Sequence, residues 1–439
     1  MTLIILFVAI IALLLLISWL KVNPFLSLTL VTIVVGLAHG LSGQIVVKAM
    51  AKGVGDTMGS LLFVIGFGVM LGSLITETGA AQQICNGFLR LFGEKYVKLV
   101  VLINSLIVGI ALFYNAGFIV LIPLVFAISS QLKTPLVPLV IAMATPLAVT
   151  HGFLPPHPGP TAVAQIMHAS VGKTLLYGLC VAVPTLTIVG LGLPRFVRKI
   201  QGNPPEAFFE KKLFPEEKLP GFLISIFSAA LPVLLIICAT VFTTENGFTP
   251  SLVSVFSFLG DSGIAMIVSV VFALLALGIF RGVSLTFLME KCAQGLQAVA
   301  AILLINAAGG AFKEVLTVTH TDKAIVDAMI VLPLSPLLMA WIITAMLRAA
   351  IGAATLAAIT SAGIVSSLIA ATGTSPELAV LAIGAGSLMF SHVNDSGFWL
   401  FKEYLGISVK DTFRSWTVME MLTGSIGIIM VLLLSTFVR

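Results

Sequence analysis

A stretch rich in proline and histidine interrupts an apolar region between residues 150 and 162. It consists of Thr-His-Gly-Phe-Leu-Pro-Pro-His-Pro-Gly-Pro-Thr-Ala, and its histidines are His151 and His157. A proline ring removes a backbone donor and clashes with the preceding turn, so we expect no continuous α-helix here. In a membrane, unpaired backbone is tolerated only where protein buries it or water reaches it. The interruption predicts a site for a polar ligand, with His151 as a binding residue and His157 as a candidate proton carrier.

A second polar interruption lies late in the chain, at residues 391–398, after the apolar run 379–390. A buried carboxylate is costly unless it is paired or protonated, so packing alone does not explain Asp395. Histidine titrates near neutrality, and removal from water favours the protonated form of a carboxylic acid. His392 and Asp395 are therefore a candidate proton-carrying pair. The alternative is a solvated loop between ordinary helices. Candidates for contacting substrate hydroxyls in this segment are Asn394 and Ser396.

Arg348 begins a segment of small residues that ends at Thr355 and follows the apolar run 337–347. Arginine stays charged at physiological pH, and its forked guanidinium fits a carboxylate. Arg348 is thus the main candidate for binding an acidic substrate, with Thr355 beside it. The alternative is an arginine at a helix end whose charged head reaches the membrane surface.

The segment 113–118 occupies the position in the first half of the chain that corresponds to residues 348–355 in the second half. Its sequence is Phe-Tyr-Asn-Ala-Gly-Phe. Asn115 can exchange hydrogen bonds with hydroxyl groups, and Gly117 lies two residues further on. We include both in the candidate substrate site. The alternative is that Asn115 joins two helices by a hydrogen bond.

The elements that must position these residues are membrane helices. The chain is 59% hydrophobic and 9% charged, with a mean hydropathy of +1.16, whereas a soluble domain is about 25% charged. A spanning helix needs about 20 apolar residues. Counting shorter apolar runs as well, we expect about 11–14 membrane segments, some of them re-entrant, in an all-α, multi-pass protein. The first run lacks a cleavage site, which indicates a retained helix rather than a signal peptide. Lys313 and Glu314 are interpreted as marking a membrane–water boundary.

One long polar stretch, residues 195–220, divides the chain into membrane units at 1–194 and 221–439. Its lysines and arginines predict a cytoplasmic loop. Residues 67–75 align weakly with 308–316, and the same offset of 241 places residue 150 on residue 391. This pattern predicts two repeats, inverted if each has an odd number of spans. The substrate site would then lie at their interface near the bilayer midplane.

Several function classes are not supported by the sequence. The formal net charge of +5 comes mainly from short connections between apolar runs, so it does not indicate nucleic-acid binding. The four cysteines have no disulfide or metal-binding spacing, and we expect no metal or cofactor. No hydrolase elbow or zinc-protease motif occurs, which argues against an enzyme. Neither rings of charge nor a filter sequence suggests a channel.

The two interrupted motifs resemble those of the gluconate permease family of bacterial proton symporters. The similarity includes residues 150–162, 390–404, 309–313 and 335–341, and it extends over essentially the whole chain. The family takes up gluconate and related sugar acids such as idonate, and its relatives carry fructuronate, glycerate or D-serine. The Gly-Phe-Leu form of the first motif is closer to the sugar-acid branch.

This resemblance implies an ion-transporter fold of two inverted repeats, each with a re-entrant hairpin and a broken helix. It implies a scaffold and a transport domain, a homodimer in the bacterial inner membrane and an elevator-like movement. Residues 113–118 and 348–356 would be the hairpin tips, and 151–160 and 391–398 the unwound segments.

The chain departs from the family pattern at Asn115, where family members commonly carry a glutamate. Asp395 with His392 is therefore our substitute proton carrier, followed by His151 or His157. We expect a secondary active transporter that takes up gluconate or a related sugar acid with protons. The alternative is an uncoupled or differently coupled carrier for another small hydroxy or amino acid.

Overall fold

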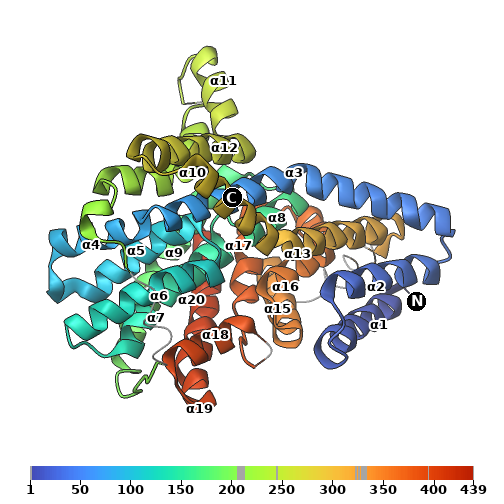
Figure 1. Cartoon of the computed structure of the whole chain (residues 1–439). Coiled ribbons are helices and arrows are strands. Elements are labelled where there is room, and N and C mark those ends of the chain that lie inside the picture. Colours follow the sequence, from blue (N-terminus) through green and yellow to red (C-terminus); the bar gives the residue numbers. More distant parts are fainter. Residues whose placement is uncertain are drawn as a thin grey trace.

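The computed structural model describes residues 2–204, 213–243, 246–321, 334–393 and 395–438, together with 324 and 327. Within these ranges the regular structure is entirely helical (Figure 1). The predicted all-α class is therefore confirmed for the described part of the chain.

Eight helices of the described residues are long and apolar enough to cross a membrane, or up to nine if one bent pair counts as a span. Shorter apolar helices lie at Thr2–Ile17, Pro24–Ala38, Pro250–Leu259, Pro336–Ala349 and Pro376–Ser387, so the 11–14 segments expected, which included such shorter pieces, stay a prediction. The eight are Tyr114–Gln131, Leu136–Ile166, Val171–Arg195, Phe222–Val241, Ser262–Arg281, Val299–Val318, Ala354–Thr372 and Val409–Leu434.

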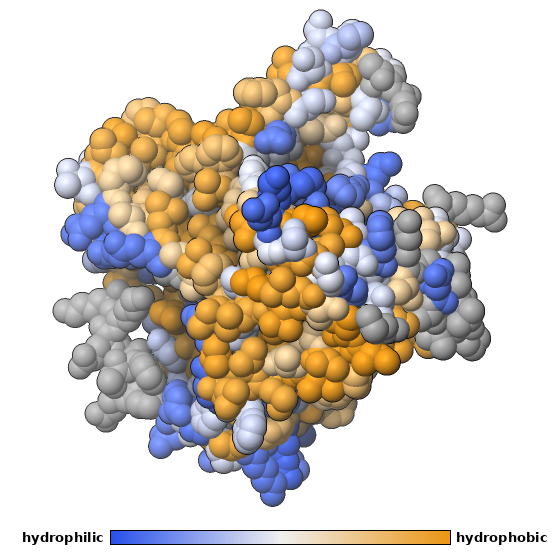
Figure 2. Space-filling model, turned by 90° about the vertical axis from the view of Figure 1, so that its right-hand side faces the viewer, coloured by the Kyte–Doolittle hydropathy of each residue, from blue (hydrophilic) through white to orange (hydrophobic). Residues whose placement is uncertain are grey.

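Large apolar side chains cover much of the outside of the molecule. Figure 2 shows broad hydrophobic areas on one face, with hydrophilic residues gathered in separate groups. Among the exposed apolar side chains are Ile188, Leu223 and Ile429. Exposed apolar area on this scale is the surface expected of a protein that contacts lipid.

Two long helices, α3 (Gly43–Glu77) and α13 (Leu285–Val318), pack along each other in antiparallel directions (Figure 1). Gly53 lies against Gly310, where an added Cβ would come within 2.3 Å of the Gly310 carbonyl oxygen. The two backbones can approach this closely because glycine has no side chain. Lys52 of α3 pairs with Glu314 of α13 at 2.9 Å. Glu314 thus joins these two helices.

Two pairs of helices are each joined by only two residues. Helix α5 (Val97–Ala111) is followed by α6 (Tyr114–Gln131), and α15 (Pro336–Ile351) by α16 (Ala354–Thr372). After α15 the chain turns at Gly352, whose φ of 82° suits glycine because it has no Cβ. The second connection lies within the predicted hairpin tip 348–356, whereas the first, residues 112–113, only reaches the start of the predicted tip 113–118.

Two further helices are interrupted at the predicted polar motifs. Helix α7 (Leu136–Phe153) and α8 (Pro158–Ile166) are separated by residues 154–157, and α17 (Pro376–Ser387) and α18 (Ser396–Leu405) by residues 388–395. The first break is narrower than predicted, since the helix continues through His151. Helix α8 restarts at Pro158, because the first helical position needs no backbone donor.

The remaining helices surround these elements. They are α1 (Thr2–Leu14), α2 (Pro24–Ala38), α4 (Ala80–Phe92), α9 (Val171–Thr185), α10 (Phe222–Val241), α11 (Pro250–Leu259), α12 (Ser262–Ala273), α19 (Val409–Thr412) and α20 (Val418–Leu434). Helical turns of π type occupy Leu15–Trp19, Leu186–Gly192, Leu274–Gly278 and Phe413–Thr417, and 3₁₀ turns occupy Glu94–Tyr96, Leu193–Arg195, Glu216–Lys218 and Ile279–Arg281. The predicted loop at 195–220 is described at 195–204 and 213–220.

Candidate functional site

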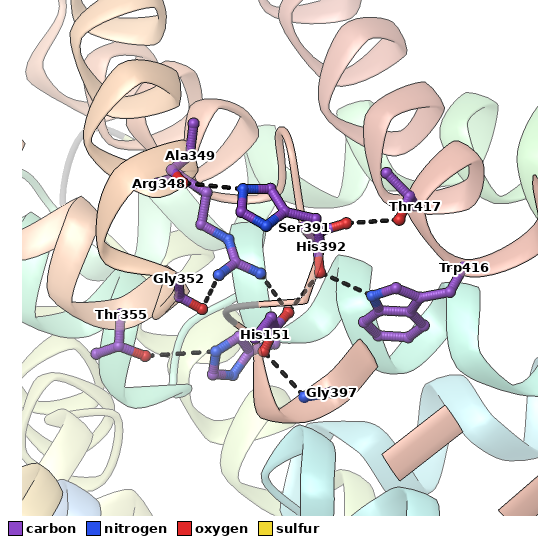
Figure 3. A network of polar contacts seen from close by, with 11 residues as sticks. His151, Arg348, Ala349, Gly352, Thr355, Ser391, His392, Gly397, Trp416 and Thr417 are labelled. Carbon is purple, nitrogen blue, oxygen red and sulfur yellow. Dashed lines mark hydrogen bonds and ion pairs between the residues drawn. The ribbon is translucent and has the colours of Figure 1, made fainter. Parts of the chain in front are cut away.

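The connection between α15 and α16 meets the break between α17 and α18 at a buried ion pair. Arg348, in the last turn of α15, is only 2% exposed, and its Nη2 lies 2.5 Å from Oδ2 of Asp395. Its Nη1 donates to the carbonyl of Gly352 (Figure 3). Arg348 therefore does not reach the membrane surface as in the alternative interpretation. Its Nε has no hydrogen-bond partner among the described residues, which leaves one guanidinium donor unused.

Asp395 is the residue that precedes α18, and it also caps that helix. Its Oδ1 accepts a hydrogen bond from the backbone N–H of Gly397 at 2.9 Å. A carboxylate at this position satisfies a free helix donor and is favoured by the helix dipole. The segment is thus not a freely solvated loop, because Asp395 is held by both a helix N-terminus and a guanidinium.

A chain of hydrogen bonds supports the other oxygen of Asp395. Ser391 donates to Oδ2 at 2.5 Å, and Trp416 Nε1 donates to Oγ of Ser391 at 2.7 Å. Thr417 donates to the backbone carbonyl of Ser391 at 2.6 Å. Figure 3 shows these residues converging on the break. Ser391 and Arg348 thus share Oδ2 of Asp395, and together with the bond from Gly397 to Oδ1 they fix the orientation of its carboxylate.

His392 does not pair with Asp395 as the sequence suggested. Its Nε2 donates to the carbonyl of Ala349 at 3.0 Å (Figure 3). The oxygens of Asp395 are instead used by Arg348, Ser391 and Gly397. His392 therefore ties the second break to the last turn of α15. The hydrogen-bond geometry offers no direct proton path between the two residues.

The two histidines of the first motif lie on the other side of the site. His151 Nε2 is 3.3 Å from Oγ1 of Thr355, so α7 and α16 meet here. The rings of His151 and His157 are 5.6 Å apart and nearly perpendicular. His157 Nε2 donates to the carbonyl of Gly109 on α5 at 2.5 Å. His157 thus fastens the first break to α5, whereas His151 faces Arg348 and Asp395, with which it interacts electrostatically.

Three of the remaining candidates, Asn115, Ser396 and Gly117, take no part with their side chains in the hydrogen-bond network around Arg348 and Asp395. Asn115 and Ser396 are exposed, and none of the hydrogen bonds described involves their side chains. Gly117 is buried, and an added Cβ there would meet Leu147 of α7 at 2.9 Å, which indicates a packing role. Asn394 lies outside the described residues.

Sequence reasoning missed two buried polar residues of the site. Glu420 on α20 is 3% exposed and interacts electrostatically with Arg348 and Asp395. The hydroxyl of Tyr114 is buried without a hydrogen-bond partner in the described residues, and its ring packs against Trp416 with centroids 5.2 Å apart. An acid within the apolar run 416–438 was the available signal for Glu420.

A small cavity adjoins His151 and Thr355. It has a volume of about 10 Å³ and is lined by the helices around both breaks, including Gly159, Pro160, Gly384 and Ser387. Ligand pockets usually enclose about 300–1,000 Å³. The segments around this cavity are therefore too closely packed for a sugar acid in the arrangement described.

Lys313 supports the first broken helix. Its Nζ donates to the carbonyl of Ile166, the last residue of α8, at 3.0 Å. A cation at a helix C-terminus is favoured by the helix dipole. Lys313 is half-buried and joins α13 to α8, so its interpretation as a mere boundary marker was incomplete.

Comparison with known proteins identifies the family to which the chain belongs. A family model described as GntP family permease matches residues 1–437. The chain belongs to this family. It is 42% identical to a high-affinity gluconate transporter of Escherichia coli K12 over 439 residues, which is 99% of each chain. It is 43% identical to the Gnt-II system L-idonate transporter of the same strain, over 98% of each chain. A gluconate permease of Bacillus subtilis 168 is 42% identical over the whole of both chains.

Two solved transporter structures resemble this GntP family permease in fold. The Alcanivorax borkumensis YdaH transporter has a TM-score of 0.67 at 11% identity, covering 95% of this chain and 98% of that chain. Neisseria gonorrhoeae MtrF has a TM-score of 0.58 at 14% identity, covering 87% and 84%. The relatives are named transporters and permeases, and the chain has eight apolar spans among its described residues. This GntP family permease is therefore a multi-pass membrane transport protein and not an enzyme.

Proposed function

We propose that this permease is a secondary active transporter that takes up gluconate or a related sugar acid together with protons. The observation that carries the proposal is the buried pair of Arg348 and Asp395, 2.5 Å apart where a helix connection meets a helix break. A buried guanidinium inside a membrane protein is a receptor for a carboxylate, and here it already holds that of Asp395. The relatives named for gluconate and L-idonate support a hydroxylated carboxylate as the substrate.

In the bound state, the substrate carboxylate takes the place of Asp395 at Arg348. The N-terminus of α18 begins beside this position and adds a favourable dipole for an anion. His151 and Thr355 lie 3.3 Å from each other at the cavity and would contact hydroxyl groups. Asn115 and Ser396 remain candidates that would contact substrate only after the segments rearrange, and Asn394, which lies outside the described residues, also remains a candidate.

Proton coupling would follow from the charges in the loaded site, which are the guanidinium of Arg348 and the carboxylates of Asp395 and the substrate. A single guanidinium neutralises one carboxylate, so a substrate anion at Arg348 leaves Asp395 without its partner. A buried unpaired carboxylate is costly, and protonation removes that cost. Asp395 would thus take up a proton as the anion binds and release it on the cytoplasmic side. His392 and His157 are weaker candidates, because each already donates to a backbone carbonyl.

The proposed movement is elevator-like, in a bacterial inner-membrane homodimer built from inverted repeats. Adding 241 to the bounds of α3 gives 284–318, close to Leu285–Val318 of α13. The same addition to α6 gives 355–372, close to Ala354–Thr372 of α16. These matching positions support two repeats, with α3 and α13 as scaffold and the paired and broken helices as transport domain.

The alternative is an uncoupled carrier, or one for another acid such as idonate, fructuronate, glycerate or D-serine. It is motivated by Asn115, which has no carboxyl group and is exposed. An uncoupled carrier only equilibrates its substrate across the membrane. A thermal-shift screen of the purified protein against sugar acids, D-serine and dicarboxylates at two pH values identifies the substrate class.

Uptake into proteoliposomes tests the coupling. With a proton gradient, acidic outside, we expect the protein to concentrate gluconate. We expect Asp395→Asn to bind gluconate with an affinity that no longer changes with pH, and to lose accumulation, because the amide cannot carry a proton. Asp411→Asn, at a half-buried acid of α19 whose carboxylate bonds to Ser408 and not to the site, is the matched control. Unchanged pH-dependent uptake by Asp395→Asn would show that the proton resides elsewhere.

A further inference from the structure

Glu420 is a buried acid for which the proposed transport cycle so far has no role. It lies in the first turn of α20, a membrane span, and is 3% exposed. None of the ion pairs found among the described residues includes it. An acid at such a position is costly to keep and points to a function in moving charge.

The surroundings of Glu420 connect it to the substrate site. It follows Trp416 by four residues, so the two side chains lie on one face of the helical segment. Trp416 donates to Ser391, which donates to Asp395. Arg348 and Asp395 both act electrostatically on Glu420.

The charged and titratable groups that interact electrostatically with Glu420 come from three elements. They are Arg348 of α15, Asp395 at the start of α18 and Tyr114 of α6. Helices α7, α9 and α17 also pack against α20, and among the described residues they add no group to this set. Tyr114 interacts electrostatically with both carboxyl groups, and its hydroxyl is buried without a partner in the described part of the chain.

The site thus holds two carboxyl groups and one guanidinium. A bound substrate brings a third carboxyl group. One guanidinium can offset one of the three, so two must be protonated for the loaded site to be neutral. Asp395 alone accounts for one of these protons.

We propose that Glu420 is a second proton-carrying residue of the transport cycle, which holds the proton that Asp395 receives on substrate binding. In the empty site Glu420 is a neutral acid and Asp395 pairs with Arg348. When the substrate carboxylate displaces Asp395, the carboxyl proton of Glu420 moves to the Asp395 carboxylate, and Glu420 becomes the anion. Glu420 then regains a proton from water on the acidic side. One substrate anion and one proton cross together, and the loaded site carries no net charge.

The proposal rests on the proposed proton symport and is tested by separating accumulation from exchange in proteoliposomes. Exchange of labelled for unlabelled gluconate needs no net proton release, whereas accumulation does. We expect Glu420→Gln to lower the rate of proton-driven accumulation by about 100-fold, while exchange stays near the wild-type rate. Glu420→Asp keeps a carboxyl group and should restore part of the accumulation. Glu403→Gln, at an exposed acid of α18, should change neither rate.

Two results would overturn the role of Glu420. One is wild-type accumulation by Glu420→Gln, and the other is an equal loss of accumulation and exchange, which indicates a packing role. If Glu420→Gln cannot be purified, Glu420→Asp is compared with wild type across pH, and an unshifted uptake profile likewise overturns the proposal. Failure of the wild-type protein to accumulate any sugar acid overturns proton symport itself, whatever the variants do.

Discussion

At the scale of the residue, the site depends on how the guanidinium of Arg348 distributes its donors. One amino group faces Asp395 and the other the carbonyl of Gly352, while Nε is left without a partner among the described residues. Because the guanidinium of Arg348 stays charged and has several donors, it can bind the carboxylate of a substrate in place of that of Asp395. A lysine at this position has a single charged nitrogen and cannot contact the same groups together.

We accordingly expect Arg348→Lys to lower the affinity for gluconate by about 10–100-fold, the equivalent of one charge-assisted hydrogen bond. Isothermal titration or thermal shift with purified protein measures this. Arg90→Lys is the control, because Arg90 pairs with Glu216 at an exposed position far along the chain from the site. Full affinity in Arg348→Lys would rule out a bidentate contact with the substrate carboxylate.

At the scale of the element, glycines set how closely helices approach. Gly384 of α17 lies against the backbone of Gly152 on α7, which brings the two broken helices together. Gly53 and Gly310 do the same for α3 and α13. In a membrane such close contacts replace the hydrophobic driving force, since lipid is as apolar as the protein surface.

The variant Gly53→Ala tests the close packing of α3 against α13, and a second glycine of α3 provides the control. An added Cβ would meet the backbone of Gly310 and force α3 and α13 apart, so we expect the free energy of unfolding to fall by about 1–3 kcal/mol. Gly55→Ala is the matched control, because nothing lies within 4 Å of a Cβ at Gly55. Thermal unfolding in detergent compares the two. Equal melting temperatures would mean that the α3–α13 crossing tolerates a methyl group.

At the scale of the whole molecule, the long pair α3 and α13 borders the elements that form the site. Gly72 of α3 lies beside the connection after α5, where a Cβ would be 3.5 Å from Cγ of Leu112. Gly36 of α2 contacts Val46 of α3 in a similar way, with 3.2 Å to Cγ1. In the elevator movement that we propose, the first contact would be broken in each cycle, whereas the second would persist if α2 belongs with α3 to the scaffold.

Cysteine pairs distinguish these two contacts in a variant whose native cysteines are replaced by alanine. We expect oxidation of Gly72→Cys with Leu112→Cys to stop uptake, and a reductant to restore it, because the disulfide holds the transport domain against the scaffold. Oxidised Gly36→Cys with Val46→Cys should transport normally. Normal uptake with the first pair oxidised would mean that α3 and the α5–α6 connection move together.

The sequence by itself determined the membrane class and the two interrupted motifs, and it singled out Arg348 and Asp395, which the structure brings together. These inferences depend on local properties. Proline breaks a helix whatever surrounds it, and a charge within an apolar run is costly in any membrane fold. The family relationship followed from the same motifs.

The tertiary structure alone decided which side chains meet. Asn115 is exposed whereas its neighbour Tyr114 is buried, and His392 bonds to Ala349 rather than to Asp395. Glu420 interacts with Arg348 and Asp395, although the sequence offered no reason to group it with them. The physical reason is that successive helical residues point about 100° apart, since a turn takes 3.6 residues. The facing partner is then set by packing between helices that are far apart in the chain.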